Sequence, residues 1–488
     1  MRTGKDYTGA LADGRKVYVD GEAVPDVTAH PAFAGILASV SKLYDFAADP
    51  ASEMTCPVPE TGRPALKNFM IPRSAAGLAA RREAIAKWAD LTHGWVGRAP
   101  DHVAGFLAGF ASNPAVFDRE NRKLGANVTR WYRRLLDESL FLSYVIIPPQ
   151  VSRDVTAHGW DGEYLQAGVV EERGDGILVR GSQMLGTAAA VSDYLFVSCI
   201  KPLTPEDTDY AVSFVVPVSA PGLKIYCRRP YATGQPSGFD YPLSTRYDET
   251  DALVVFDDVA VPWEDVFICR DVAGVREQFF GTPAHVLGNH QAQIRLISKL
   301  KFILGVARRI CAVNQIDTIP SVTEKLGELA SLASAVEACA VAAEATAAPD
   351  GQGVFRPNPR FLYGAMGLQA EIYPRVLHLL RELAGGGLIQ LPSSYRELTA
   401  EETRADMERY IRSPGVPAQE RVKLFKLAWD AVGSEFAGRH HQYEMFYAGA
   451  PFVAKGYAYR NYDFTESLAM VEKFLSGYDL PGPAGGER

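Results

Sequence analysis

The spacing of the hydrophobic residues divides the chain into three parts. Over residues 31–142 the apolar positions recur at helical spacing, most clearly over 85–95, and glycine and proline interrupt them. The two consecutive prolines at 148–149 cannot continue a helix, and they favour extended backbone before them. We therefore predict a mainly helical N-terminal domain that covers residues 1–147.

The second part consists of short runs of β-branched and aromatic residues separated by turn residues. The turn Gly174-Asp175-Gly176 joins a run over 168–172 to a run over 177–180, which is typical of a hairpin. Because no helices alternate with the strands, the pattern predicts an antiparallel β domain over residues 148–271 and disfavours a Rossmann domain. Further strands are predicted over 194–200, 210–218, 223–227 and 252–261.

Helical spacing returns in the third part, residues 272–488. Small residues on a helical stripe let helices approach closely, so we predict a C-terminal helical bundle followed by a short tail. The three glycines at 385–387 follow a helical run and indicate a helix end; no Lys-Ser/Thr follows them, as a phosphate loop would require. The overall fold class is therefore α+β. The clearest stripe contains Leu326, Leu329, Ala333, Val336, Ala340 and Ala343.

Composition narrows the function to small-molecule chemistry. The 488 residues are 47% hydrophobic and 22% charged, which is typical of a globular protein with one or two large cores. The formal net charge of -8 gives no broad positive field, so neither nucleic acid nor an anionic membrane is an expected partner. The apolar stretch over 329–348 is rich in alanine and contains two glutamates, which favours a packed helix over a membrane span.

The cysteines and the first residues of the chain indicate a cytoplasmic protein without a metal site. Six cysteines are scattered along the sequence, with no Cys-x-x-Cys pair and no histidine nearby at metal-ligand spacing. They are expected to be free thiols in a reducing compartment. The polar start, residues 1–7, lacks the apolar core of a signal peptide, so export is not expected.

Longer stretches resemble known families. A hairpin over 174–187 and a closing strand over 256–264 resemble the acyl-CoA dehydrogenase superfamily, which has the same order of parts and implies an antiparallel β-barrel in the middle. Matches to a narrower family are long and follow its order over nearly the whole chain, which makes them a strong signal. They resemble the large component of 4-hydroxyphenylacetate 3-monooxygenase and read DVTAHPAF (26–33), GWVGRAPD (94–101), DYPLSTRYDE (240–249), LPSS (391–394) and WDAVGSEFAGRH (429–440).

The resemblance implies the oxygenase component of a two-component flavin monooxygenase. In that family a separate NAD(P)H-dependent flavin reductase supplies reduced FAD, which reacts with molecular oxygen to give a flavin hydroperoxide that hydroxylates a phenol at the ortho position. The hydroperoxide must be kept from water and the phenol should be electron-rich, so an apolar pocket with a few placed polar groups is expected.

The resemblance leaves the substrate and the oligomeric state less closely defined than the type of reaction. A 4-hydroxyphenylacetate-like phenol, a tyrosine derivative and an aryl group tethered to a carrier protein are all compatible. The family is typically a homotetramer, so a homotetramer or homodimer is expected. The tail after the bundle is shorter than in relatives, which leaves a tail-mediated subunit contact open.

Three residues carry the implied catalytic site. Arg98 matches the family arginine that holds the substrate near the flavin, and a fixed cation there favours phenolate over phenol; the alternative is a surface ion pair with Asp101. Histidine and tyrosine have exchanged places relative to the family, because His102 replaces the usual tyrosine and Tyr144 replaces the substrate-contacting histidine. Either the pair still grips the phenolic oxygen, with His102 as a general base whose pKa lies near neutrality, or one of the two has become packing.

Further residues are implied to contact FAD or the substrate. The Thr187 hydroxyl would face the isoalloxazine edge, and Arg295 would bind the pyrophosphate or else form a helix-surface ion pair. The segment over 433–439 would let a backbone approach the dinucleotide, unless it marks a tight helix crossing. The predicted cofactor-binding residues are Gln150, Thr187, Gln291, Arg295, Ser434, Gly438 and Arg439. The predicted substrate-binding residues are Arg98, His102, Tyr144, His290, Tyr447 and Gly449.

Two other classes of function stay open at this point: an acyl-CoA dehydrogenase- or dehydratase-type flavoenzyme that acts on a thioester, and a flavin-binding subunit without catalysis. An acyl-CoA dehydrogenase would need a catalytic carboxylate over the flavin, which the sequence does not single out. The related dehydratase needs cysteine ligands for its iron-sulfur cluster, and Arg98 and His102 stand at the positions that resemble its paired cysteines. A flavin-binding subunit without catalysis would accept reduced FAD but would form no hydroxylated phenol.

Overall fold

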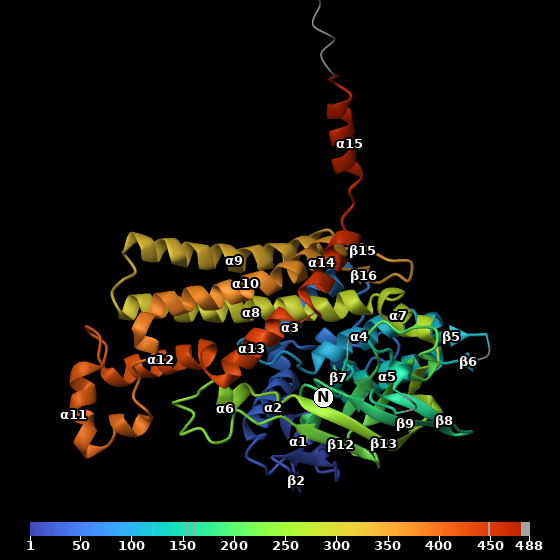
Figure 1. The fold of residues 1–488 in the computed structure, drawn as a ribbon, viewed down its shortest axis with the longest axis horizontal. Coiled ribbons are helices and arrows are strands. Elements are labelled where there is room, and N and C mark those ends of the chain that lie inside the picture. The colour runs from blue at the N-terminus through green and yellow to red at the C-terminus, as the bar shows by residue number, and fades with distance from the viewer. Residues whose placement is uncertain (121, 153, 161–162, 448, 480–488) are drawn as a thin grey trace, which may run out of the picture.

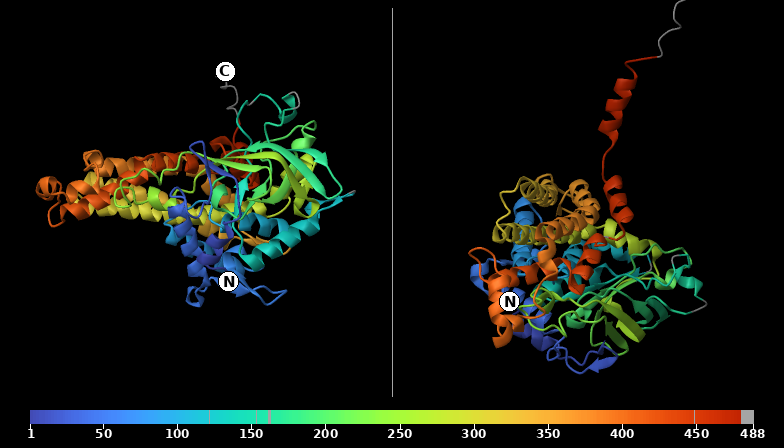
Figure 2. Two further views of the ribbon diagram at one scale, coloured as in Figure 1. Left: turned by 90° about the horizontal axis from the view of Figure 1, so that it is seen from below. Right: turned by 60° about the vertical axis from the view of Figure 1, so that its left-hand side comes forward.

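The computed structural model describes residues 1–120, 122–152, 154–160, 163–447 and 449–479 (Figure 1). The last residues of the predicted tail, 480–488, lie outside the described residues. Long helices of the C-terminal part lie along one side of the molecule, and the strands lie on the other side together with the N-terminal helices (Figure 1, Figure 2).

The N-terminal part is mainly helical, as predicted. α3 (Ala75–Leu91) begins where the Ser74 hydroxyl accepts a hydrogen bond from the Gly77 backbone N–H at 3.0 Å, which satisfies one of the free donors at the helix start. Its buried side carries Ile85 and Trp88, at the spacing seen in the sequence. The other helices of this part are α1 (Gly4–Ala10), α2 (Ala34–Ala48), α4 (Asp101–Ser112) and α5 (Gly125–Glu138).

The strands form two main sheets. The six-stranded sheet has the order β2-β1-β12-β13-β9-β8, and the four-stranded sheet has the order β14-β11-β10-β7. Much of the long β13 alternates between buried and more exposed residues, as expected when one face of a sheet packs on the core. Their bounds are β1 (Val17–Val19), β2 (Glu22–Val24), β7 (Leu142–Val145), β8 (Gly168–Glu172), β9 (Gly176–Gln183), β10 (Tyr194–Val197), β11 (Val212–Pro217), β12 (Leu223–Cys227), β13 (Ala252–Pro262) and β14 (Val266–Cys269).

These sheets correct the predicted antiparallel barrel. β1 pairs in parallel with β12, and β7 pairs in parallel with β10. Within the described residues the strands form separate open sheets, so the predicted closed barrel is wrong. β1, β2 and β7 precede residue 148, so residues of the N-terminal part extend both sheets. Three two-stranded ribbons also occur, β3 (Thr55–Pro57) with β4 (Pro64–Leu66), β5 (Asp118–Arg119) with β6 (Arg122–Lys123), and β15 (Ala348–Pro349) with β16 (Phe355–Arg356).

The C-terminal part forms the predicted helical bundle. α8 (Ala284–Val313) packs against α9 (Pro320–Ala345) and α10 (Pro359–Ala384), and its residues 284–296 are all buried. α10 ends at Gly385, whose φ of 58° suits glycine, so the predicted helix end is confirmed. The remaining helices are α6 (Ser244–Tyr247), α7 (Val272–Phe280), α11 (Glu401–Tyr410), α12 (Ala418–Val432), α13 (Glu435–Met445), α14 (Pro451–Arg460) and α15 (Thr465–Leu475).

Two helices of this part expose apolar side chains. α9 is long and apolar enough to cross a membrane by length and composition alone, but it packs against α8 and α10 through buried Leu329, Val336, Ala340 and Ala343. α15 projects away from the rest of the molecule (Figure 1, Figure 2). Its apolar side chains are exposed at Leu468, Met470, Val471, Phe474 and Leu475.

Candidate active site

Arg98 and His102 meet at the start of α4. Arg98 lies in the turn before the helix, where its backbone N–H donates to Glu249 Oε1 at 2.6 Å. His102 lies in the first turn of α4 and is 2% exposed. One terminal nitrogen of the Arg98 guanidinium is 2.5 Å from His102 Nε2. The two residues are thus in contact, although α4 begins only after Arg98.

Asp101 does not form the surface ion pair that was the alternative role for Arg98. Its side chain is buried, and it accepts hydrogen bonds from Asn68 Nδ2 at 3.3 Å and from Gln291 Nε2 at 2.9 Å. Burial raises the pKa of this carboxyl group to about 6. The predicted pair between Arg98 and Asp101 is therefore wrong, and the arginine faces His102 instead.

His102 is a neutral imidazole in this site. Burial lowers its pKa well below the usual value, and the Arg98 charge lowers it further. Because arginine only donates hydrogen bonds, Nε2 must accept from Arg98, and the proton of the neutral ring then lies on Nδ1. The premise that the pKa of His102 lies near neutrality is therefore wrong, since the ring stays unprotonated at neutral pH.

Aromatic side chains surround the Arg98 guanidinium. Its central carbon lies 4.3 Å from the ring centre of Tyr447, 5.5 Å from Tyr443 and 5.8 Å from Tyr144. The Tyr144 ring, on β7, stands edge-on to His102 with 5.4 Å between the ring centres. Burial raises the pKa of Tyr144, so this phenol group stays protonated. The site is thus a cation in a mostly aromatic enclosure.

A chain of hydrogen bonds links Thr187 to Arg98. Thr187 Oγ1 donates to Asp251 Oδ1 at 2.7 Å, and Arg439 binds both carboxylate oxygens of Asp251 at 2.9 and 2.6 Å. Another nitrogen of Arg439 donates to Glu249 Oε2 at 3.2 Å, and the other oxygen of Glu249 holds the Arg98 backbone. The guanidinium of Arg439 is therefore engaged with two carboxylates, and its predicted contact with FAD stays a prediction.

The backbone around this chain is strained. Leu185 and Ala188, which flank Thr187, have φ values of 57° and 60°, and Thr250, between the two carboxylates, has a φ of 53°. Residues other than glycine rarely adopt positive φ, and such positions cluster at functional sites because the surrounding structure holds them there. The strain indicates that the placement of Thr187 and Asp251 is enforced by the fold.

Arg295 belongs to a buried charge cluster behind the tyrosines. Its guanidinium makes a two-point contact with the Glu444 carboxylate, with NH2 2.8 Å from Oε2, and Lys299 Nζ lies 2.8 Å from Oε1. The three side chains are at most 1% exposed, so the predicted helix-surface ion pair is wrong. Arg295 also lies 5.1 Å from the ring centre of Tyr447. The cluster supports one wall of the site, and the predicted pyrophosphate contact of Arg295 remains untested.

Two further residues of α8 are buried and already hydrogen bonded. Gln291 donates to Asp101, and its Oε1 lies 3.4 Å from His102 Nδ1. His290 uses both ring nitrogens, one at 3.2 Å from Arg81 and the other at 2.8 Å from Glu344. Gln291 therefore lies between Asp101 and the Nδ1 side of the His102 ring. The structure gives His290 no free ring nitrogen for its predicted substrate contact.

The remaining predicted residues lie around the start and the end of α13. Ser434 caps this helix by accepting a hydrogen bond from the Ala437 backbone at 3.1 Å. A Cβ atom at Gly438 would meet no other atom within 4 Å, so this glycine borders open space and does not mark a tight crossing. Gly449 has a φ of 96°, which suits glycine. Gln150 is the one remaining predicted residue that lies elsewhere, exposed after β7. Their contacts with ligands stay predictions.

Sequence reasoning missed several polar residues of the site. Tyr443, Glu249, Asp251 and Glu444 had no predicted role, although each contacts a predicted residue. Glu249 is the last residue of the family-like stretch over 240–249, and this was the one signal in the sequence that could have indicated its role. The others carry no motif, and their partners are far away in the sequence.

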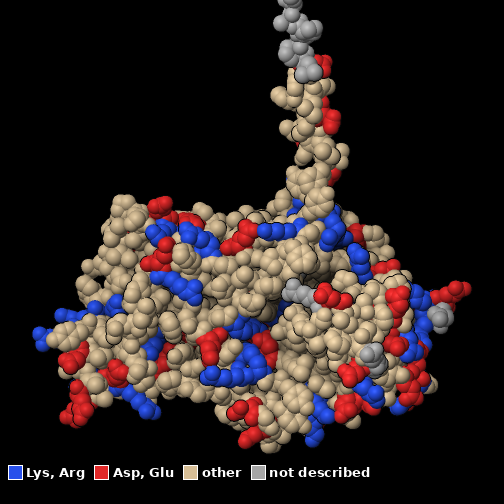
Figure 3. Space-filling view, in the orientation of Figure 1, with Lys and Arg blue, Asp and Glu red and all other residues tan. Residues whose placement is uncertain are grey.

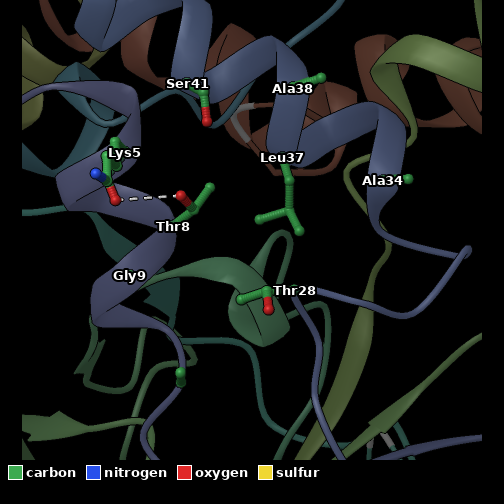
Figure 4. A pocket seen from close by; sticks show the side chains of 9 residues that line it. Lys5, Thr8, Gly9, Thr28, Ala34, Leu37, Ala38 and Ser41 are labelled. Atoms are coloured by element: carbon green, nitrogen blue, oxygen red, sulfur yellow. Dashed lines mark hydrogen bonds between the residues drawn. The ribbon is translucent and has the colours of Figure 1, made fainter.

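Two hollows differ in what lines them. Figure 3 shows a hollow near the middle of one face, beside the C-terminal end of α13, with Lys and Arg side chains around it. A second hollow, of about 600 Å³, lies between α1 and α2 (Figure 4). The second is lined mainly by small and hydroxyl side chains, with Lys5 as its one charged residue, and it contains none of the predicted site residues.

Comparisons with known proteins show the family of this chain. Two family models match the chain: the N-terminal part of 4-hydroxyphenylacetate 3-hydroxylase over residues 3–268 and its C-terminal part over residues 275–476. The chain belongs to this family. The family resemblance found in the sequence is thereby confirmed over nearly the whole length.

Two relatives illustrate the range of the 4-hydroxyphenylacetate 3-hydroxylase family. The 4-hydroxyphenylacetate 3-monooxygenase oxygenase component of Pseudomonas aeruginosa is 35% identical, over 98% of this chain and 94% of that protein. A monooxygenase of Streptomyces globisporus is 34% identical, over 92% of this chain and 85% of that protein. Its name gives a (3S)-3-amino-3-(3-chloro-4-hydroxyphenyl)propanoyl group on a peptidyl-carrier protein as the substrate.

Solved structures show the same fold. The HpaB oxygenase component of 4-hydroxyphenylacetate 3-monooxygenase, complexed with FAD and 4-hydroxyphenylacetate, matches with a TM-score of 0.92 and 32% identity, over 98% of this chain and 99% of that chain. An archaeal 4-hydroxybutyryl-CoA dehydratase from N. maritimus matches with a TM-score of 0.88 at 19% identity, over 100% of this chain and 97% of that chain, which shows the fold alone. Among the described residues, no group of three His, Cys, Asp or Glu side chains is placed to hold a metal, so these residues do not provide a ligand set for an iron-sulfur cluster.

Proposed function

We propose that this chain is the oxygenase component of a two-component monooxygenase that uses reduced FAD and molecular oxygen to hydroxylate a phenol ortho to its hydroxyl group. The single observation that carries the proposal is the buried contact between Arg98 and His102 inside an aromatic enclosure. One residue is a permanent donor and the other a neutral acceptor, and they face each other. A phenolic hydroxyl needs both, one for its oxygen and one for its hydrogen.

The chemistry of the pair follows from its protonation. When a phenol enters between the two side chains, Arg98 donates to the phenolic oxygen and His102 Nε2 accepts the phenolic proton. Loss of this proton makes the ring more electron-rich, and the fixed positive charge of Arg98 favours the phenolate. The rings of Tyr443, Tyr447 and Tyr144 surround the Arg98 guanidinium, and such an apolar enclosure keeps water away from the reacting groups.

The residues beside this pair fit a flavin. Thr187 gives its only hydroxyl proton to Asp251, so its oxygen could accept a hydrogen bond from the N–H of a bound ligand, and Thr187 would help to hold the reduced isoalloxazine. Gly438 borders open space at the first turns of α13, where a long cofactor can approach the backbone. When bound, reduced FAD supplies the electrons with which oxygen is activated for transfer to the phenol. We also propose that the chain consists of three domains, with boundaries after residues 147 and 271.

The partners are a flavin reductase, a phenolic substrate and further copies of the chain. Hydroxylation consumes reduced FAD, so a separate NAD(P)H-dependent reductase must supply it. The substrate is a 4-hydroxyphenylacetate-like or tyrosine-derived phenol, and the Streptomyces globisporus relative supports a carrier-tethered form as well. An 11-residue helix is marginal in water on its own, so the exposed apolar face of α15 supports assembly into a homodimer or homotetramer.

Single-turnover oxidation tests the function. The protein is mixed without oxygen with chemically reduced FAD and a phenol, oxygen labelled with a heavy isotope is admitted, and the product is analysed by mass spectrometry. A catechol that contains one labelled oxygen is expected from 4-hydroxyphenylacetate or another phenol of the panel, free or thioester-linked. The Arg98→Met variant is the matched control and should bind FAD but form the catechol about 10- to 100-fold more slowly. A wild-type protein that oxidises FAD but hydroxylates no phenol would leave only the flavin-binding alternative.

A further inference from the structure

Two polar side chains lie buried behind His102 and have no part in the chemistry above. Gln291, on α8, is 1% exposed, and Asp101, at the start of α4, is 1% exposed. Gln291 Nε2 donates to Asp101 Oδ1 at 2.9 Å, and Asn68 holds the other carboxylate oxygen at 3.3 Å. Buried polar groups without a function in packing are costly, so their arrangement calls for a role.

The direction of each hydrogen bond follows from which groups can donate. The Asp101 oxygens that face Gln291 and Asn68 accept, so the NH2 group of the Gln291 amide must point to Asp101 and its Oε1 must point the other way. On that side lies His102 Nδ1, at 3.4 Å. An oxygen atom at this place favours a hydrogen on Nδ1 and leaves the lone pair of the ring on Nε2.

The other polar neighbours of the ring agree with this direction, except for a longer contact of 3.4 Å between the same Arg98 nitrogen and Nδ1. Arg98 donates to Nε2 at 2.5 Å, and Arg295 adds positive charge farther away. The Tyr447 hydroxyl, 3.4 Å from Nδ1, lies 3.4 Å from the Gly97 carbonyl, to which it donates, so its oxygen is free to accept from Nδ1–H. Tyr144 meets the ring through an edge-to-face contact.

We propose that Gln291, oriented by Asp101, is a positioning residue that holds His102 in the form with hydrogen on Nδ1, so that Nε2 receives the phenolic proton. The inference rests on the proposed function and deepens it. In the step, the phenolic O–H bond breaks, an N–H bond forms at Nε2, and the negative charge stays on the phenolic oxygen beside Arg98. Gln291 Oε1 then accepts from the Nδ1–H of the charged ring and stabilises it. Without this acceptor the ring takes up the proton less readily.

The ionisation of a bound phenol tests this inference without any turnover. The probe is 4-nitrophenol, whose phenolate absorbs at a longer wavelength than the phenol, titrated against pH on the full-length wild-type protein and on variants. In Gln291→Met the ratio of bound phenolate to phenol at a given pH is expected to fall about tenfold, which is a rise of about one unit in the pKa of the bound probe. Gln291→Glu keeps an oxygen toward Nδ1 and can share a proton with Asp101, so the ratio should stay within about threefold of the wild-type value.

A matched control lies on the same helix. Gln293 is 0% exposed and donates to Gln369 at 2.8 Å, away from His102, so Gln293→Met should leave the ionisation of the bound probe unchanged. Equal ionisation in the wild type and Gln291→Met, with the labelled catechol still formed by the wild type, would refute the role of Gln291 and leave the proposed function standing. If Gln291→Met does not fold, Gln291→Glu decides alone, and a ratio that falls about tenfold in that variant, although the acceptor is kept, overturns the inference. A wild-type protein that binds the probe without promoting its ionisation overturns both.

Discussion

Replacing Glu444 by glutamine should destabilise the whole protein. The carboxylate is 0% exposed and neutralises Arg295 and Lys299, which are 1% and 0% exposed. Breaking a buried ion pair by removing one partner typically costs about 3–5 kcal/mol, because it leaves a buried charge uncompensated. Lysine can escape by losing its proton, since burial already lowers the pKa of Lys299 to about 7 although Glu444 opposes this, whereas arginine cannot. We therefore expect a loss of about 3 kcal/mol in Glu444→Gln, a large part of a typical stability of about 5–15 kcal/mol.

The pKa of Glu444 gives a similar magnitude. Burial raises it, but Arg295 and Lys299 outweigh burial and lower it from 4.5 to about 2. By linkage, a depression of this size contributes about 3 kcal/mol. This contribution is present above pH 4.5 and disappears as pH falls toward 2. The part of the stability difference between wild type and Glu444→Gln that comes from the Glu444 carboxylate should therefore shrink as pH falls from about 4.5 toward 2.

Urea unfolding followed by far-ultraviolet circular dichroism measures the difference. Glu435→Gln is the control on the same helix, because that carboxylate is exposed and pairs only with the exposed Arg229, so a change below about 1 kcal/mol is expected. Lys299→Met leaves Arg295 and Glu444 as a balanced pair and should cost less than Glu444→Gln. A loss below about 1 kcal/mol in Glu444→Gln, or one that does not change between pH 4.5 and pH 2, would refute the reasoning.

Three further predictions follow from the site and the surface. Arg98→Met should lower kcat/KM for phenol hydroxylation about 10- to 100-fold, because it removes a charged hydrogen bond to the phenolic oxygen; rates within threefold of wild type would contradict this. Thr187→Val should weaken the affinity for reduced FAD about fivefold in an anaerobic fluorescence titration. The affinity of Thr187→Ser, which keeps the hydroxyl, should stay within about twofold of the wild type, and equal losses in both variants would indicate a packing role instead. Replacing Leu468 and Phe474 on α15 by glutamate should at least halve the molar mass in size-exclusion chromatography with light scattering, and an unchanged mass would show that α15 does not join subunits.

The local patterns predicted most elements well. β8 and β12 have the predicted bounds, and α9 carries the predicted buried stripe, because each depends on the spacing of its own residues. β10 ends at Val197, three residues before its predicted end. β1 and β7 were not predicted, since each has only three or four residues and pairs with a strand far along the chain. The open sheets also could not be separated from a closed barrel, because closure depends on which strands pair.

The candidate site could be predicted where it rests on family motifs. Arg98, His102, Tyr144 and Tyr447 come together as proposed from the sequence. Their electrostatics could not be predicted in the same way. The pKa of His102 is low because the ring is buried beside an arginine, and neither burial nor that contact is visible in a single residue type.

Buried charge partners were invisible for the same reason. Asp251 and Arg439 are 188 residues apart, and Arg295 and Glu444 are 149 residues apart. No spacing rule connects residues at such distances, so an arginine beside a predicted cofactor site was interpreted as a ligand-binding group. In the structure, both arginines neutralise carboxylates that the sequence did not single out, and their contacts with FAD stay predictions.

The link from Thr187 through Asp251, Arg439 and Glu249 to Arg98 has a consequence for how the protein is made. Ribosomes synthesise the chain from its N-terminus, so both carboxylates emerge long before the arginine that neutralises them, 188 residues later for Asp251. Until then Asp251 has only Arg228 as an arginine partner, and the connection to Glu249 is incomplete. The final arrangement of Thr187 and Arg98 can therefore form only after α13, near the end of the chain, has been synthesised.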